Sequence, residues 1–166
     1  LCKFAAMVAR KFNAHLIGVH TMGTMEVYTD LMAATTVPQM TAFHNDQQDT
    51  STQIKEIFER VTNPEDFVAE WREIDLLNEN SESGVLPDWL GSDLIIIGQS
   101  NPKNERPDQR SLVERAVRGS GRPVLVMPYL GDFEDVGKSI LMGWSATRES
   151  TRAAHDALPL IKDAKK

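Results

Sequence analysis

The sequence lacks several features that would point to particular classes of protein. It contains one cysteine, Cys2, so no disulfide can form within the chain, and a lone cysteine fits a reducing cytoplasm. Its longest apolar runs, LIII at 94–97 and PVLVMP at 123–128, are far shorter than the roughly 20 residues that span a membrane. Basic charge is also scarce, because the formal net charge is −6 and a nucleic-acid-binding face needs positive charge. We therefore expect a cytoplasmic protein that binds neither membranes nor nucleic acid.

What is present is the composition of an ordinary globular protein, with 166 residues, 41% hydrophobic and 25% charged. Periodicity predicts helices at 1–12, 38–61, 82–90, 111–118 and from about 147, and strands at 15–21, 67–74, 94–99, 123–128 and 139–145. Asn13 is expected to end the first helix. Strands that alternate with helices predict an α/β fold with a parallel sheet covered on both faces.

Four stretches carry a resemblance to a known family. SDLIIIG at 92–98, with the loop and helix after it, and GRPVLVMP at 121–128 are similar to the C-terminal half of a universal stress protein domain. VARKFNAHLIGVH at 8–20 resembles the end of that domain's first helix and its second strand, and SILMGWSATRESTRAAHDALPLI at 139–161 resembles its first strand and first helix. The resemblance implies a Rossmann-like open sheet of five parallel strands, in the order 3-2-1-4-5, with helices on both faces.

The order of these stretches predicts an unusual domain organisation. Residues 1–130 are expected to form a universal stress protein-like domain that lacks its first strand, and 131–138 to form a linker. Residues 139–166 then supply a first strand and helix, either completing this domain or beginning a second one. Because 1–12 and 147–164 would compete for one helix position, we favour a fragment of a tandem protein, with further residues upstream. The main variant is a central strand borrowed from a neighbouring chain.

The loop after the strand at 94–99 is the candidate ligand site. Nucleotide-binding members of the family carry a glycine at the end of this strand, another three residues later, and a glycine followed by serine or threonine where the next helix begins. Such glycines let the backbone approach phosphates, and a helix N-terminus offers unpaired N–H groups. Here the first position is Gly98, the second is Asn101 followed by Pro102, and the third is Arg110–Ser111. The phosphate-binding pattern is therefore degenerate.

Two further observations bear on nucleotide binding. The acidic residue that meets the nucleoside in the family falls on Ser145. The basic side chains of Lys103, Arg106 and Arg110 could instead hold a phosphate, but charges on a solvated loop are the favoured interpretation. ATP or AMP binding through the 98–111 loop, with slow hydrolysis, is thus the alternative to a module without a cofactor.

No catalytic or metal-binding constellation is predicted. Ser111 has no histidine placed to activate it, and Glu114 three residues later makes a helix-capping box the simpler interpretation. The four histidines, which show no spacing typical of metal ligands, are His15, His20, His44 and His155.

The sequence therefore predicts a non-enzymatic, dimerising regulatory module of the stress response with degenerate or lost nucleotide binding. Its partner is expected at the strand 123–128, which should form the edge of the sheet. In the family this edge pairs with its counterpart across a dimer axis, or with the second domain of a tandem chain. Either a homodimer or a tandem contact would cover it.

Overall fold

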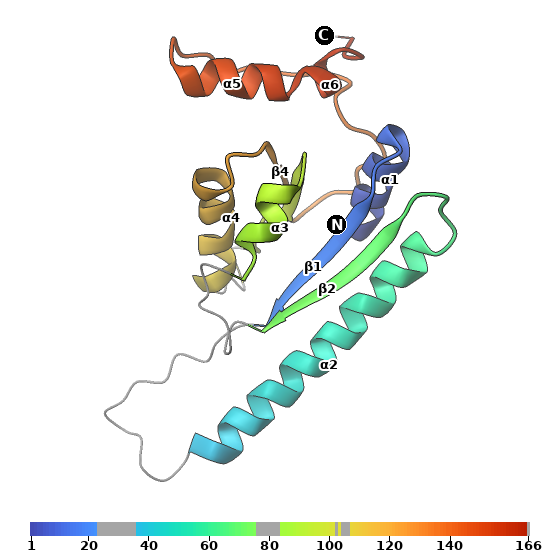
Figure 1. Ribbon diagram of the computed structural model, residues 1–166, viewed down its shortest axis with the longest axis vertical. Coiled ribbons are helices and arrows are strands. Elements are labelled where there is room, and N and C mark those ends of the chain that lie inside the picture. The colour runs from blue at the N-terminus through green and yellow to red at the C-terminus, as the bar shows by residue number, and fades with distance from the viewer. Residues whose placement is uncertain (23–35, 76–83, 102, 104–106, 166) are drawn as a thin grey trace. The chain divides into compact units, whose positions relative to one another are not determined.

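A computed structural model describes residues 1–22, 36–75, 84–101, 103 and 107–165, with the backbone alone at 36–40, 43 and 107–111. The elements in chain order are α1 (Cys2–Phe12), β1 (Leu16–Met22), α2 (Thr36–Thr62), β2 (Ala69–Asp75), α3 (Leu86–Gly91), β3 (Ile95–Gly98), α4 (Pro107–Gly119), β4 (Val124–Met127), α5 (Arg148–Asp156) and α6 (Leu158–Ile161) (Figure 1). The chain divides into two compact units, one of Ala9–Asp88 and one of Trp89–Lys166 together with Lys3–Val8. The predicted linker at 131–138 stays a prediction.

The helix α1 ends where the sequence predicts. Asn13 has a φ of 48°, in the left-handed region that asparagine tolerates better than most residues. The N–H of Asn13 donates to the carbonyl of Arg10 at 3.3 Å, and that of Ala14 to the carbonyl of Ala9 at 2.9 Å. These bonds occupy carbonyls that the end of a helix would leave without partners.

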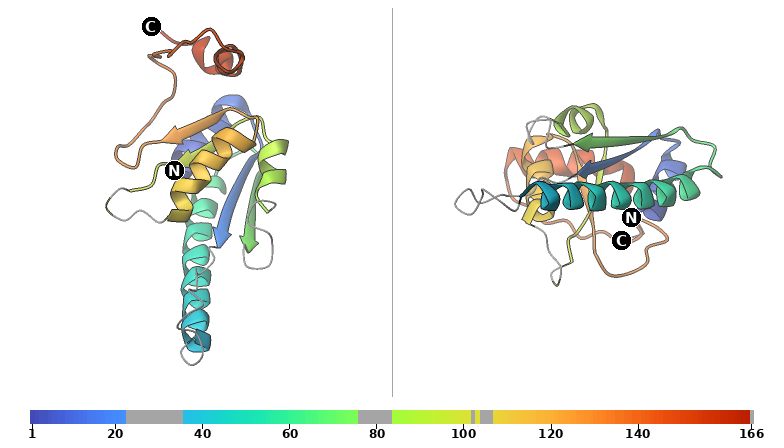
Figure 2. Two further views of the ribbon diagram at one scale, coloured as in Figure 1. Left: turned by 90° about the vertical axis from the view of Figure 1, so that its left-hand side faces the viewer. Right: turned by 90° about the horizontal axis from the view of Figure 1, so that it is seen from below.

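The first unit is a strand–helix–strand arrangement. β1 and β2 pair in parallel, with Leu16 opposite Ala69 and Met22 opposite Asp75, and α2 runs along one face of the pair (Figure 2). α2 has 27 residues, and its buried positions recur on one helical face: Gln47, Ser51, Phe58 and Thr62. Most of these buried side chains are polar.

Within the described residues, no helix combines the length and the apolar character needed to cross a membrane.

Gly18 brings α2 close to the strands of this unit. A Cβ atom at Gly18 would lie 2.8 Å from both Phe58 Cε2 and Trp71 Cε3. The Phe58 and Trp71 rings pack with centroids 5.4 Å apart, and His20 stacks on Trp71 at 6.2 Å. The missing side chain of a glycine therefore makes room for the aromatic packing of this unit.

The second unit repeats the same topology with a different interior. β3 and β4 pair in parallel, with Ile95 opposite Val124 and Gly98 opposite Met127. Its core is apolar: Phe4, Val8 and Met127 are buried together, and the partly buried residues against them are Met7, Leu94, Ile96, Leu125 and Val136. These short strands are the nearly unbroken apolar runs of the sequence, although Val126 of β4 is 39% exposed.

The predicted five-stranded open sheet is wrong. The described strands form two separate two-stranded parallel sheets, β1–β2 and β3–β4. The pairing within each half is parallel as predicted, but no described strand joins β1 to β3. A strand exists only through hydrogen bonds to a neighbour, so an apolar run alone does not create one.

The run at 139–145, predicted as a first strand, forms neither strand nor helix. The helix predicted after it does form, as α5 and a short α6, with a break at Ala157 and a proline in the first turn of α6. Of the two elements predicted from residue 139 onward, the strand is wrong and the helix is confirmed.

Candidate functional site

Gly98 is the last residue of β3, and the loop follows it. The N–H of Gln99, the next residue, donates to the carbonyl of Met127 at 2.7 Å, which continues the β3–β4 ladder by one residue. Asn101 then accepts a hydrogen bond on its side-chain Oδ1 from the N–H of Lys103 at 3.0 Å. This is an Asx turn, in which a side chain occupies a backbone donor of the loop. One N–H group that a phosphate would need is thus already bonded within the loop.

Gly98 occupies open space in the described structure. A Cβ atom there would meet only Leu1 Cδ2, at 3.8 Å, which is an ordinary van der Waals distance. Its φ is not among the positive values of the described glycines. Neither packing against the described residues nor backbone conformation requires a glycine here, so the described structure leaves room for another group to approach the backbone at Gly98.

Arg110–Ser111, the third position of the predicted site, lies inside α4 and not at its first residue. α4 begins at Pro107, whereas the sequence predicted a start at 111. Ser111 is therefore the fifth residue of α4, beyond the first turn whose N–H groups lack partners. Its capping-box interpretation with Glu114 is wrong for the same reason. The side chains of Arg110 and Ser111, and all of Pro102 and Arg106, lie outside the described residues.

Ser145 belongs to a cluster of hydroxyl groups at the start of α5. Its Oγ lies 2.7 Å from Ser150 Oγ and 3.4 Å from Thr147 Oγ1. Thr147 is the N-cap of α5, with φ −122° and ψ 162°, and its side chain accepts from the N–H of Ser150. The hydrogen bonds of Ser145 thus serve a helix cap, and they do not join it to Gly98 or Asn101, which lie at the end of β3 and in the loop after it. The predicted ligand site at Gly98, Asn101, Arg110, Ser111 and Ser145 therefore stays a prediction.

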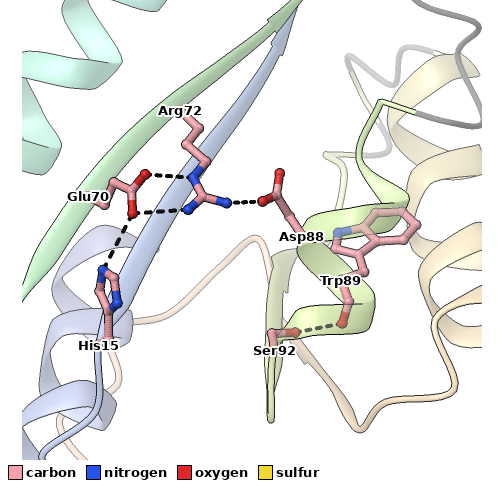
Figure 3. Close-up of polar contacts among 6 residues, drawn as sticks. All are labelled: His15, Glu70, Arg72, Asp88, Trp89 and Ser92. Atoms are coloured by element: carbon pink, nitrogen blue, oxygen red, sulfur yellow. Dashed lines mark hydrogen bonds and ion pairs between the residues drawn. The ribbon is translucent and has the colours of Figure 1, made fainter.

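A polar network that the sequence did not reveal lies in the first unit (Figure 3). Arg72 donates to both carboxylate oxygens of Glu70, from Nε at 2.8 Å and from Nη2 at 3.0 Å, and also to Asp88. His15 Nε2 lies 3.7 Å from Glu70 Oε2. The bond from Arg72 lowers the pKa of Glu70, and the two carboxylates raise the pKa of Arg72. The two carboxylates of Glu70 and Asp88 carry more negative charge than Arg72 carries positive charge, so this arginine is poorly suited to bind an anion.

A cavity of about 330 Å³ lies beside the C-terminal end of α2, and it is lined by Phe58, Glu59, Thr62, Asn63, Glu65, Phe67, Ala69 and Trp71. Arg10 holds one of the two carboxylates, donating from Nε to Glu65 Oε2 at 2.7 Å, which lowers the pKa of Glu65. The acidic lining repels phosphate. This cavity does not replace the 98–111 loop as a nucleotide site.

His20 is a partly buried histidine whose environment sequence reasoning missed. Its Nε2 is buried and has no hydrogen-bond partner among the described residues. Burial lowers the pKa of His20, an effect that the nearby Glu73 carboxylate partly opposes. The alternation of LIGVHTM could have indicated that His20 shares the helix-covered face with Gly18.

Among the described residues, no group of three His, Cys, Asp or Glu side chains is arranged to hold a metal ion.

Comparison with known proteins identified no relatives: no family model, curated protein or solved structure matches the chain.

Proposed function

We propose that this chain is a non-catalytic regulatory module of the kind that universal stress proteins represent, with weakened or lost nucleotide binding. The observation that carries the proposal is the loop after β3. It combines a glycine that neither packing nor φ requires with an Asx turn that occupies the N–H of Lys103. The loop keeps the position of a phosphate-binding loop, and its Asx turn engages the N–H of Lys103.

The repeated strand–helix–strand topology supports the proposal. In each half a helix connects two strands that pair in parallel, and α4 follows the loop after β3, although it begins four residues earlier than predicted. Binding modules of this type act by association, and β4 offers a surface for it. Val126 is 39% exposed on this strand, which leaves part of its apolar surface open to a partner.

Calorimetry with ATP and AMP tests the nucleotide half of the proposal. We expect a dissociation constant weaker than about 100 μM, which corresponds to roughly −5.5 kcal/mol. Low-micromolar affinity would contradict the proposal and favour the alternative, a stress protein that binds ATP or AMP through the 98–111 loop.

The variant Arg110→Ala separates the two ways in which the loop could hold a phosphate. If basic side chains bind it, this change should weaken binding by about 1.5–3 kcal/mol, as for a charged hydrogen bond. Lys138→Ala is a matched control, because it also removes an exposed cation but lies outside the loop. Equal affinities for all three proteins would exclude binding through Arg110.

The variant Val126→Lys tests association through β4. We expect sedimentation velocity at micromolar concentration to show a dimer for the wild type and a monomer for this variant. A dimer that survives the change would place the contact elsewhere.

A further inference from the structure

The cavity at the C-terminal end of α2 is built where the chain turns from α2 into β2. Its lining comes from the last turns of α2, the loop 63–68 and the first residues of β2. Ala69 and Trp71 are two residues apart on β2, so their side chains point to the same face of the strand. The small side chain of Ala69 leaves space beside the indole of Trp71. The resulting volume of about 330 Å³ lies at the lower end of the roughly 300–1,000 Å³ typical of small-molecule sites.

Aromatic rings form much of this lining. Three of the eight lining residues are Phe58, Phe67 and Trp71, although aromatic residues make up only 7% of the chain. The rings of Phe58 and Trp71 pack with their centroids 5.4 Å apart and their planes tilted by 45°. The indole Nε1 of Trp71 donates to Glu73 Oε1 at 2.9 Å, so the polar atom of this ring already has a partner. What the rings offer a ligand is apolar contact and the negative potential of their faces.

The charged residues of the lining are both acidic. They are Glu59 and Glu65, and none of the eight lining residues is basic. The Glu65 side chain is only 13% exposed, and Arg10 donates to both of its carboxylate oxygens. The hydrogen bonds from Arg10 lower the pKa of Glu65, so this carboxylate is ionised at neutral pH. Because a single arginine accompanies two carboxylates, the charge around the cavity remains negative.

An organic cation fits this lining better than a metal ion. Ca²⁺ takes about six to eight oxygen ligands, whereas the described part of the chain contains no group of three His, Cys, Asp or Glu side chains arranged to hold a metal. Aromatic rings supply no ligand atoms to such an ion. They do attract alkylammonium groups, whose positive charge is spread over apolar substituents.

We propose that this cavity binds a small alkylammonium compound, of the kind that carries a trimethylammonium group. The rings of Phe58, Phe67 and Trp71 contact the alkyl substituents, and Glu59 and Glu65 supply the negative charge. The site lies within the first unit and uses no residue of the 98–111 loop. Binding here goes beyond the proposed function and is independent of it.

Titration with choline tests the site. NMR at constant ionic strength follows the backbone amide of Ala69 and the indole N–H of Trp71, which both belong to lining residues. The control ligand is the neutral isostere of choline, an alcohol in which carbon replaces the nitrogen. We expect saturable shifts at both probes, with a dissociation constant of about 1 mM for choline and at least about fivefold weaker binding of the alcohol.

Two isosteric variants of α2 separate a local charge from the charge of the whole protein. Glu59→Gln removes a carboxylate of the lining, and Glu56→Gln removes an exposed carboxylate one turn earlier that does not line the cavity. We expect Glu59→Gln to weaken choline binding about three- to tenfold and Glu56→Gln to change it by less than about twofold. Both residues are exposed, so both variants should keep the wild-type fold.

A second pair of variants tests the aromatic lining. Phe67→Leu removes a ring of the loop 63–68 and keeps apolar bulk, whereas Phe67→Tyr keeps the ring. We expect Phe67→Leu to weaken choline binding about two- to fivefold and Phe67→Tyr to retain the wild-type affinity.

Any of four outcomes would overturn the proposal. The first is the absence of a saturable shift at Ala69 and Trp71 up to about 20 mM choline. The second is equal affinity for the neutral isostere, which would identify an apolar cavity only. The third is equal choline affinity in Glu59→Gln and Glu56→Gln, and the fourth is unchanged affinity in Phe67→Leu. Low-micromolar ATP affinity would refute the proposed function without deciding the cation site, so the two proposals fail separately.

Discussion

The two units share a topology and differ in what holds them together. In the first, β1 and β2 pair under a 27-residue helix. The buried face of that helix is mostly polar, and the contact depends on Gly18 admitting the Phe58 and Trp71 rings. In the second, shorter strands pair beside an apolar cluster that includes Phe4, Val8 and Met127.

The two units differ in strand length and in what they bury. The first unit has seven-residue strands, which supply more ladder hydrogen bonds, and α2 buries the polar residues Gln47, Ser51 and Thr62 beside the apolar Phe58. Four-residue strands supply few, so the second unit depends on burial of apolar side chains. The second unit also contains the exposed apolar residues Leu141, Met142 and Trp144.

The largest expected effect is on the apolar unit. Phe4 is 5% exposed, and Phe4→Ala should cost about 3–5 kcal/mol, because it opens a cavity in the cluster with Val8 and Met127. Hydrogen exchange should show faster opening of β3 and β4 than of β1 and β2. Phe12→Ala is the control, since Phe12 lies on the same helix and is 40% exposed. An equal loss of stability in both variants would contradict this account of the core.

A smaller effect should distinguish the two strand glycines. Gly18→Ala puts a methyl group 2.8 Å from two aromatic rings that pack on each other, so we expect a loss of about 1–3 kcal/mol in urea unfolding. Gly98→Ala places its methyl group 3.8 Å from the Leu1 side chain and should change stability by less than about 0.5 kcal/mol. If the two substitutions cost the same, the close approach at Gly18 does not contribute to the stability of the first unit.

The smallest expected effect concerns pH and the buried histidine. Burial lowers the pKa of His20 from its usual 6.5, so below that pH the unfolded chain binds a proton that the folded chain excludes. Stability of the first unit should fall as pH drops below 6.5, by at most about 1.4 kcal/mol per pH unit for one proton. The decline should stop once pH falls below the folded pKa.

The variant His20→Gln supplies the control, and its urea midpoint should stay flatter than that of the wild type between pH 6.5 and 5. Glu65, Glu70 and Glu73 do not obscure this window. Their pKa values are lowered from 4.5 in the folded protein, so the stability that they contribute is lost only at lower pH. Identical pH profiles for the two proteins would show that His20 does not titrate as a buried group.

Local signals predicted most of the helices and strands. Asn13 ends α1 with the positive φ that its side chain tolerates, and Pro107 starts α4 where a missing N–H costs nothing. The start of α4 was nevertheless predicted four residues late, because the SLVE pattern at Ser111 looked like a cap. The candidate site was also only partly predictable from the sequence. Gly98 could be found because it ends an apolar strand. The Asx turn at Asn101 and the hydroxyl contacts of Ser145 at the start of α5 could not be found in this way.

What the sequence by itself determined is the alternation of elements and the parallel pairing within each half, because apolar periodicity and short-range turns encode them. Only the tertiary structure decided that these strands form two sheets, and that SILMGWS is not a strand. The physical reason is that a strand is defined by hydrogen bonds to a neighbour that can lie anywhere in the chain or in another chain. A helix such as α5 forms its bonds within itself and therefore appears where its residues favour it.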